Sequence, residues 1–121
     1  MMTSLTVIVP VYNEENLVIE SLKRLDKVNI VNKVIIVDDC STDNSNKLIT
    51  DFILHKNKYF MIKTIKNSGK GKAIEAAQSM IDTDYVAIHD ADLEYYPEDL
   101  LKMYKKIHDN NLILGSRFIG N

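Results

Sequence analysis

The chain alternates short apolar runs with segments whose apolar residues recur at helical spacing. The first run, Leu5–Val11, is rich in β-branched residues and nearly continuous in apolarity, which is typical of a parallel strand covered on both faces. Strands that alternate with helices of about ten residues pair in parallel through right-handed crossovers. The pattern therefore predicts an α/β fold, a three-layer α/β/α sandwich with a mainly parallel sheet. The predicted strands are Leu5–Val11, Val34–Val37, Tyr59–Ile65, Tyr85–His89 and Leu112–Leu114.

Four amphipathic stripes separate these strands and predict one helix each. Pro10 has no N–H to give to a ladder, so the first strand is expected to end or bulge there. No repeat or linker divides the sequence, and residues 1–121 are predicted to form one domain. The apolar residues of the stripes are Val18, Leu22 and Leu25, then Leu48, Ile49 and Phe52, then Ala73, Ile74, Ala77 and Ile81, then Leu100, Leu101, Tyr104 and Ile107.

Charge and cysteine content limit the classes of partner and compartment. The 15 basic and 17 acidic residues give a net charge of −2, which does not favour a broad nucleic-acid surface. Cys40 is the single cysteine, so a disulfide framework is excluded and a reducing, cytoplasmic location is expected. No apolar run approaches the roughly 18 residues of a spanning helix. Contact with a membrane is therefore expected at its cytoplasmic surface or through a segment outside this sequence.

Polar residues follow every predicted strand. The first strand is followed by Tyr12, Asn13 and Glu14, and the second by Asp38 and Asp39. Because parallel strands present their carboxyl ends at one edge of the sheet, where ligands bind in open α/β folds, these groups are expected to converge. The later groups are Gly69, Lys70 and Lys72 after the third strand, Asp90 and Asp92 after the fourth, and Arg117 after the fifth.

Asp90 and Asp92 predict a divalent-metal site. Carboxylates crowded in one loop repel each other unless a cation joins them, and Mg²⁺ or Mn²⁺ favours such oxygens together with those of a substrate phosphate. Glu94 is a candidate third contact, or it faces water. The alternative interpretation of these acids is a solvated loop without metal. His89, directly before them, is interpreted as a half-buried strand residue rather than a catalytic one.

The remaining candidates each have two interpretations. Asp39 could accept hydrogen bonds from a nucleobase or ribose, or cap the following helix. Lys70 and Lys72 could face phosphate oxygens or lie on an ordinary surface, and Arg117 could clamp a diphosphate. The glycine-rich phosphate loops are excluded, because Lys66 and Ile74 stand where their glycines belong. Cys40 is expected to be a small buried side chain.

Taken together, the motifs resemble those of the family 2 glycosyltransferases of GT-A fold, most closely the polyprenyl-phosphate (dolichol-phosphate) sugar transferases. Five motifs in the family's order carry the resemblance over almost the whole chain. They are Val9–Glu14, Val37–Asp43, Asn67–Ala73, Asp90–Glu94 and Gly115–Phe118.

The resemblance implies transfer of a sugar from a UDP- or GDP-linked donor, with inversion, to an acceptor such as a polyprenyl phosphate. It implies that Asp39 contacts the nucleobase of the donor and that Asp90, Asp92 and Glu94 bind the metal. It also implies catalytic roles for Asp90, Asp92 and Arg117. Acceptor contacts are expected from a region beyond residue 121, and no general base is identified. The implied donor contacts are Pro10, Tyr12, Asn13, Glu14, Asp38, Asp39, Gly69, Lys70, Lys72, Asp90, Ala91, Asp92 and Arg117.

Two other functions remain open at this stage. A nucleotidyltransferase shares the layered fold and the metal, but it usually has a basic glycine-rich loop after the first strand, where this chain has Pro10–Glu14. A phospho-receiver module also has an acidic pair resembling Asp38–Asp39, but there the pair follows the first strand.

Overall fold

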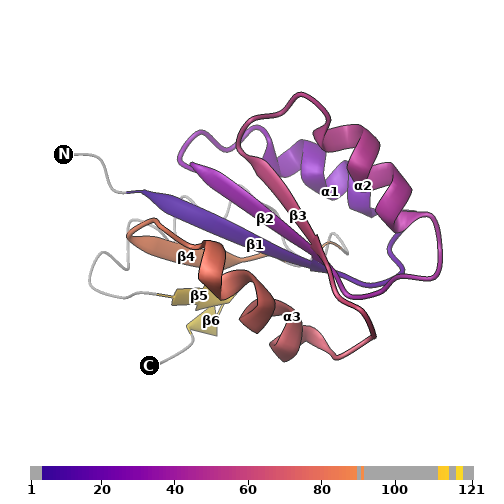
Figure 1. Cartoon of the computed structure of the whole chain (residues 1–121). Coiled ribbons are helices and arrows are strands. Elements are labelled where there is room, and N and C mark those ends of the chain that lie inside the picture. Colours follow the sequence, from indigo (N-terminus) through magenta and orange to yellow (C-terminus); the bar gives the residue numbers. More distant parts are fainter. Residues whose placement is uncertain (1–3, 90, 92–111, 115–116, 119–121) are drawn as a thin grey trace.

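The computed structural model describes residues 4–89, 91, 112–114 and 117–118. One sheet runs in the order β3-β2-β1-β4-β5-β6, parallel except for β6, which pairs antiparallel with β5 (Figure 1). The predicted parallel sheet is thus confirmed. The strands are β1 (Leu5–Val11), β2 (Lys33–Asp38), β3 (Tyr59–Lys63), β4 (Tyr85–Ile88), β5 (Leu112–Leu114) and β6 (Arg117–Phe118).

Helices cover both faces of the sheet, as a three-layer sandwich requires. Helices α1 (Val18–Leu25) and α2 (Ser45–Ile53) lie on one face, and α3 (Lys70–Ala77), continued by the 3₁₀ turn η1 (Gln78–Met80), lies on the other (Figure 1). The pleat of β1 feeds both cores, since Val7 and Val9 pack toward α1 and α2, and Ile8 packs toward α3. The helix predicted around Leu100, Leu101, Tyr104 and Ile107 lies outside the described residues.

The expectation that Pro10 ends or bulges β1 is wrong. The strand continues through Pro10, which pairs in register with Val37 of β2. The alternation of hydrogen bonds explains why. The carbonyl of Val11 accepts from Asp39 N on the β2 side at 2.8 Å, and that of Ile8 accepts from His89 N on the β4 side at 2.9 Å. The backbone of Pro10 therefore faces the β4 side at a position beyond the end of β4, where the ladder requires no N–H donor.

Several predicted boundaries also change. β2 runs from Lys33 to Asp38, one residue beyond the predicted strand at each end, and β4 ends at Ile88 instead of His89. β3 ends at Lys63 instead of Ile65, and the next residue, Thr64, bonds to Asp39 through its hydroxyl. α3 ends at Ala77, and Ile81 packs against the same core after η1. Arg117 was expected in a loop, but it lies in β6, paired with Leu114.

The strand order reverses between β1 and β4. From β1 the chain first adds β2 and β3 on one side and later β4 and β5 on the other. Open α/β sheets bind their ligands in the crevice at this switch point, outside the carboxyl ends of the strands. A receiver-like order would instead place β3 beside β1, so the fold argues against that alternative. None of the described helices is long and apolar enough to span a bilayer.

Candidate functional site

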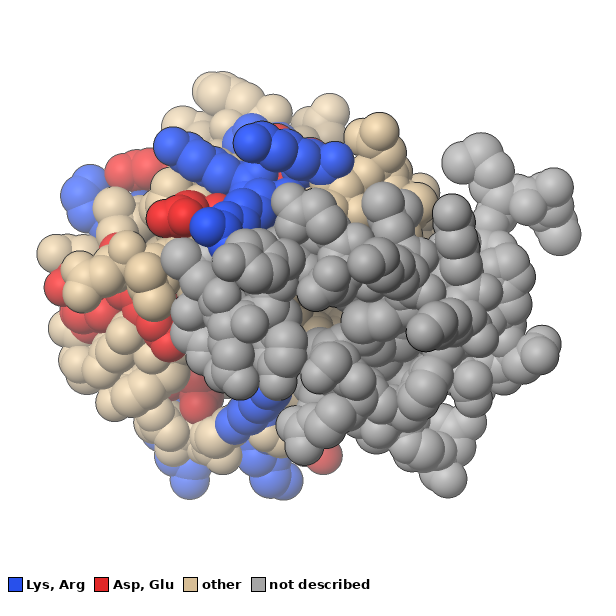
Figure 2. All heavy atoms as spheres, turned by 180° about the vertical axis from the view of Figure 1, so that it is seen from behind, with Lys and Arg blue, Asp and Glu red and all other residues tan. Residues whose placement is uncertain are grey.

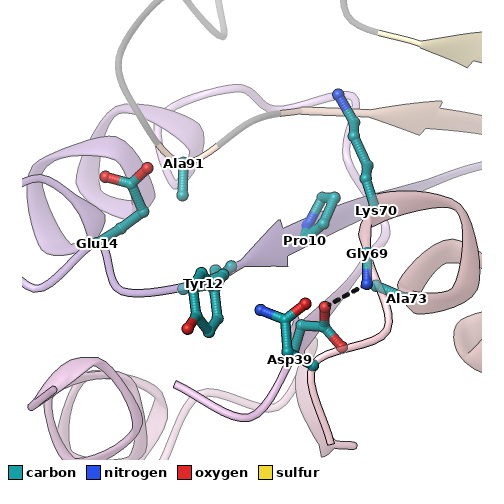
Figure 3. Close-up of a pocket in the computed structure, with 10 residues that line it drawn as sticks. Pro10, Tyr12, Glu14, Asp39, Gly69, Lys70, Ala73 and Ala91 are labelled. Carbon is teal, nitrogen blue, oxygen red and sulfur yellow. Dashed lines mark hydrogen bonds between the residues drawn. The ribbon is translucent and has the colours of Figure 1, made fainter. Parts of the chain in front are cut away.

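A pocket of about 280 Å³ opens at the switch point, beside the carboxyl ends of the first four strands (Figure 3). The volume is close to the lower end of the range for small-molecule sites. The predicted convergence of strand ends is therefore observed for β1 to β4. The lining residues are Pro10, Val11, Tyr12 and Glu14 after β1, Asp39 after β2, Asn67, Gly69, Lys70 and Ala73 after β3, and Ala91 after β4.

Hydrogen bonds between the loops after β1 and β2 fix the first wall of the pocket. Asn13 adopts a left-handed conformation with φ of 51°, which asparagine tolerates better than most residues. Its Oδ1 accepts from Thr42 N at 2.7 Å, and its own N–H donates to Ser41 Oγ at 2.9 Å. Glu14 N donates to Ser45 Oγ at 2.9 Å. Asn13 does not line the pocket. Its contacts instead hold in place its two sequence neighbours, Tyr12 and Glu14, which do.

Asp38 and Asp39, predicted together as donor contacts, face opposite sides of the sheet. Asp38 is fully buried on the α2 side. Its Oδ1 accepts from Ser41 N at 3.0 Å and its Oδ2 from Asn46 Nδ2 at 2.9 Å. Asp38 therefore fastens the loop after β2 to α2, and it does not line the pocket.

Asp39 lies in the pocket wall and organises the loop after β3. The residue is 4% exposed. Oδ2 accepts from Gly69 N at 2.8 Å (Figure 3). Oδ1 accepts from Thr64 Oγ1 at 2.8 Å, and Ser68 N lies 3.1 Å from both oxygens. Burial by itself disfavours the charged form, but the bonds from Thr64, Ser68 and Gly69 outweigh it and lower the pKa of Asp39. Asp39 is thus an ionised anchor whose oxygens already hold the loop.

Gly69 joins this loop to α3 with φ of +91°, a conformation that residues with a Cβ rarely adopt. Gly71, inside α3, has open space around its Cα, as Gly69 does. We expect Gly69→Ala to destabilise the fold by about 1–2 kcal/mol through backbone strain alone. The control Gly71→Ala should instead stabilise it by about 0.5–1 kcal/mol, because alanine favours the helix. Urea denaturation of both variants measures this, and equal effects would contradict the assigned strain.

Of the two lysines predicted to face phosphate oxygens, only Lys70 lines the pocket. Lys70 lines the pocket from the first turn of α3, and Figure 3 shows its side chain extending from beside Gly69. Lys72 does not line the pocket; its Nζ lies 3.5 Å from the carboxylate of Glu75, and its side chain is exposed to solvent. Of the pair, Lys70 is the lysine in position to meet a ligand in this pocket.

The loop after β4 contributes Ala91, which is 2% exposed and lines the pocket opposite Asp39. Its sequence neighbours Asp90 and Asp92, like Glu94, lie outside the described residues. Of Arg117, the structure describes only the backbone, which pairs with Leu114. Within the part of the chain that is described, no three His, Cys, Asp or Glu residues are grouped to hold a metal ion. The predicted metal ligands therefore remain a prediction.

The structure changes the interpretation of His89 and Cys40. His89 is buried more completely than predicted, at 2% exposure, and its Nε2 lies 3.3 Å from Ser21 Oγ of α1. It fastens the end of β4 to α1. Cys40 was expected to be buried but is only partly so, with φ of 65° and its thiol 3.7 Å from the carbonyl of Ile65.

Asn67, Val11 and Ala73 line the pocket and were not predicted as ligand contacts. The sequence holds a signal for Asn67, which opens the polar turn before Gly69 and Lys70. Val11 and Ala73 carry no such signal, because an apolar residue at a strand end or on a helix is predicted to be core.

Comparisons with known proteins agree with this architecture. The model of the family Glycosyl transferase family 2 matches residues 6–121. An undecaprenyl-phosphate 4-deoxy-4-formamido-L-arabinose transferase of Proteus mirabilis is 31% identical over 117 residues, covering 93% of this chain and 36% of its own length. The chain spans less than half the length of the curated relatives it matches.

Two solved structures share the fold. A mannosyltransferase from Pyrobaculum calidifontis, in complex with GDP-Man and Mn²⁺, aligns with a TM-score of 0.80 at 25% identity over 90% of this chain and 33% of its own. S. aureus TarS, in complex with UDP-GlcNAc, aligns with a TM-score of 0.72 at 30% identity over 88% and 32%. Because the family model matches nearly the whole of this chain, residues 6–121, the chain belongs to glycosyl transferase family 2.

Proposed function

We propose that this protein is a metal-dependent glycosyltransferase and that residues 1–121 form its donor-binding domain, which binds a nucleotide-diphospho-sugar. The observation that carries the proposal is the pocket at the switch point between β1 and β4. It combines an exposed aromatic ring, an amide, a lysine and an ionised carboxylate. Such a mixture fits a nucleoside with its phosphates better than it fits an apolar ligand.

Each lining group has a role in the proposal. Tyr12 is 45% exposed and offers its ring face to a nucleobase. Asn67 offers a donor and an acceptor to the edge of that base. Asp39 shapes the wall that receives the base, since its oxygens hold the loop from Thr64 to Gly69. Lys70 brings a positive charge toward the phosphates.

The acids on either side of Ala91 are the proposed metal ligands. Ala91 lines the pocket. Asp90 and Asp92 are its neighbours in the sequence, and Glu94 follows two residues after Asp92. Carboxylate oxygens suit Mg²⁺ or Mn²⁺, which would neutralise charge on the departing diphosphate. Arg117 is proposed to stabilise the same charge.

The relatives supply the finer proposals. Donors of this kind are bound by two structural neighbours, as GDP-Man with Mn²⁺ in one and UDP-GlcNAc in the other. The name of the Proteus mirabilis relative, undecaprenyl-phosphate 4-deoxy-4-formamido-L-arabinose transferase, includes a polyprenyl phosphate. We therefore include a polyprenyl phosphate as the acceptor, at the cytoplasmic membrane surface. Its phosphate is already anionic and could displace the nucleotide directly, which would invert the anomeric carbon.

Thermal melting with nucleotides tests the proposal. UDP or GDP with Mn²⁺ is expected to raise the melting temperature by several degrees, because a ligand that binds only the folded state stabilises it. ADP with Mn²⁺ is the control and should shift it less. A nucleoside triphosphate that stabilises the protein while both diphosphates fail would favour the nucleotidyltransferase alternative. No shift with any nucleotide would contradict the proposal.

A further inference from the structure

The loop between β3 and α3, which contributes Asn67 and Gly69 to the pocket wall, also presents an apolar side chain among lysines. Ile65 is 97% exposed, the most exposed of the large apolar side chains in the described part of the chain. The segment 63–72 contains four lysines and no acidic residue, whereas the chain as a whole has a net charge of −2. An apolar tip inside a basic segment is a combination that a purely structural loop does not require.

The loop holds this tip in a defined position. Thr64 Oγ1 lies 2.8 Å from Asp39 and 2.9 Å from the carbonyl of Lys66, and Ser68 Oγ lies 3.2 Å from the same carbonyl. The thiol of Cys40 contacts the carbonyl of Ile65. These contacts fix the backbone on both sides of Ile65. Binding of a partner at Ile65 would therefore cost little conformational entropy for ordering the loop.

Two exposed lysines, Lys63 and Lys66, flank Ile65 in the sequence. Lys63 and Lys66 are exposed, and the structure records no ion pair between either of them and a described residue. Lys72 is partly offset by Glu75. Figure 2 shows that basic side chains also gather elsewhere on the surface, so charge alone does not single out this loop. The exposed side chain of Ile65 is what distinguishes this loop from the other basic parts of the surface.

We propose that this loop docks the protein on the surface of an anionic phospholipid bilayer, with Ile65 inserted among the headgroups and Lys63 and Lys66 against their phosphates. An aliphatic tip gains from entering the headgroup region, and lysines beside it gain from the negative surface potential. A nucleic acid would use the lysines but offers nothing to the isoleucine. The inference stands on the loop itself and does not depend on the proposed donor or acceptor.

The docked orientation has a functional consequence. Asn67, Gly69 and Lys70 belong to the same loop and helix start, and they line the pocket. Docking through Ile65 would therefore bring the mouth of the pocket to the headgroup layer. A phosphate carried by a membrane lipid could then approach the pocket without leaving its bilayer.

Sedimentation with lipid vesicles tests the proposal. The protein should pellet with phosphatidylcholine vesicles containing about 30% phosphatidylglycerol at roughly 100 mM salt, and remain in solution with phosphatidylcholine alone. The double variant Lys63→Gln/Lys66→Gln should reduce the partition coefficient by about tenfold or more, since each lysine near such a surface contributes roughly fivefold. Ile65→Ser should reduce it by about threefold to fivefold.

Matched controls lie at the opposite edge of the sheet. Lys23→Gln/Lys27→Gln removes the same charge from exposed residues in and after the last turn of α1, and Leu54→Ser removes another exposed apolar side chain. Both should stay within about twofold of wild type. No binding to anionic vesicles, or equal losses in the controls, would overturn the proposal. So would binding to single-stranded DNA that exceeds vesicle binding and is insensitive to Ile65→Ser.

The same variants separate this inference from the proposed function. Ile65, Lys63 and Lys66 do not line the pocket, so their variants should keep the wild-type thermal shift with nucleotide and Mn²⁺. Loss of vesicle binding with the shift intact supports the docking surface by itself. A missing nucleotide shift in wild type would contradict the donor proposal without affecting the vesicle result.

Discussion

Replacing Asp39 with alanine is expected to lower the free energy of unfolding by about 3 kcal/mol and to abolish nucleotide binding in the pocket. The carboxylate accepts from Thr64 Oγ1 and from the backbone N–H groups of Ser68 and Gly69. Hydrogen bonds to a charged group contribute about 1.5–3 kcal/mol each, and they act here as one unit. Without them, the wall of the pocket that carries Lys70 loses its anchor. Urea denaturation and nucleotide melting shifts measure the two effects.

Asp51→Ala is the matched control for this substitution. Asp51 lies on α2 with its side chain 67% exposed, and its ion pair with Lys47 is a surface pair. Its removal should change the free energy of unfolding by no more than about 0.5 kcal/mol and leave nucleotide binding intact. An Asp39→Ala protein that is as stable as this control and still binds nucleotide would show that the anchor is not needed.

The dependence of the Asp39 effect on pH carries a defined sign. The pKa of Asp39 is lowered in the folded protein, because the three donors outweigh the opposing effect of burial. Its stabilisation is then fully present above the unfolded pKa of about 3.9 and is lost as the pH falls through the lower folded pKa. The gap in stability between wild type and Asp39→Asn should therefore be constant from about pH 5 to 7 and shrink below about pH 4.

Replacing Asp92 with asparagine is expected to remove the part of the nucleotide-induced melting shift that depends on Mn²⁺. Asp90 and Asp92 would hold the metal through anionic oxygens, and an amide oxygen is a far weaker ligand for Mg²⁺ or Mn²⁺. Asp90→Asn should act in the same direction. The shift seen with nucleotide alone, without metal, should persist, because Tyr12, Asn67 and Lys70 remain in the pocket.

Asp84→Asn provides the control for the metal experiment. Asp84 lies before β4 at the opposite end of that strand, where Ser4 Oγ contacts its carboxylate. The variant should retain the full Mn²⁺-dependent shift. If Asp92→Asn retained it as well, the ion would have to bind elsewhere in the protein.

The fold could be predicted because the sequence repeats one pattern. β-branched runs such as Leu5–Val11 and stripes such as Val18, Leu22 and Leu25 specify strands buried on both faces and helices that cover them. The prediction for Pro10 was wrong because the effect of a proline depends on which neighbouring strand its backbone nitrogen faces. That depends on where β4 ends, a relation between two segments that neither reveals alone.

The candidate site could be predicted as a location more readily than as a set of residues. Parallel strands guarantee that the groups after β1 to β4 share an edge, and they do. Asp38 and Asp39 could not be told apart, because successive residues of a strand face opposite sides and the helix on each side is set only by the tertiary fold. In the structure, Asp38 bonds to α2, and Asp39 forms part of the pocket wall. Lys70 and Lys72 separate for a similar reason, as two positions along α3 turn the side chain away from the pocket.

Mapping amide resonances by NMR tests the central claim most directly, which is that a metal–nucleotide complex binds where the first four strands end. On addition of UDP or GDP with Mg²⁺, the amides of Tyr12, Asn67, Gly69 and Ala91 should shift together, and replacing Mg²⁺ with Mn²⁺ should broaden them. Val31, Leu54 and Thr83, at the opposite edge of the sheet, should not change. Shifts confined to that opposite edge, or no shifts with any nucleotide and metal, would contradict the account.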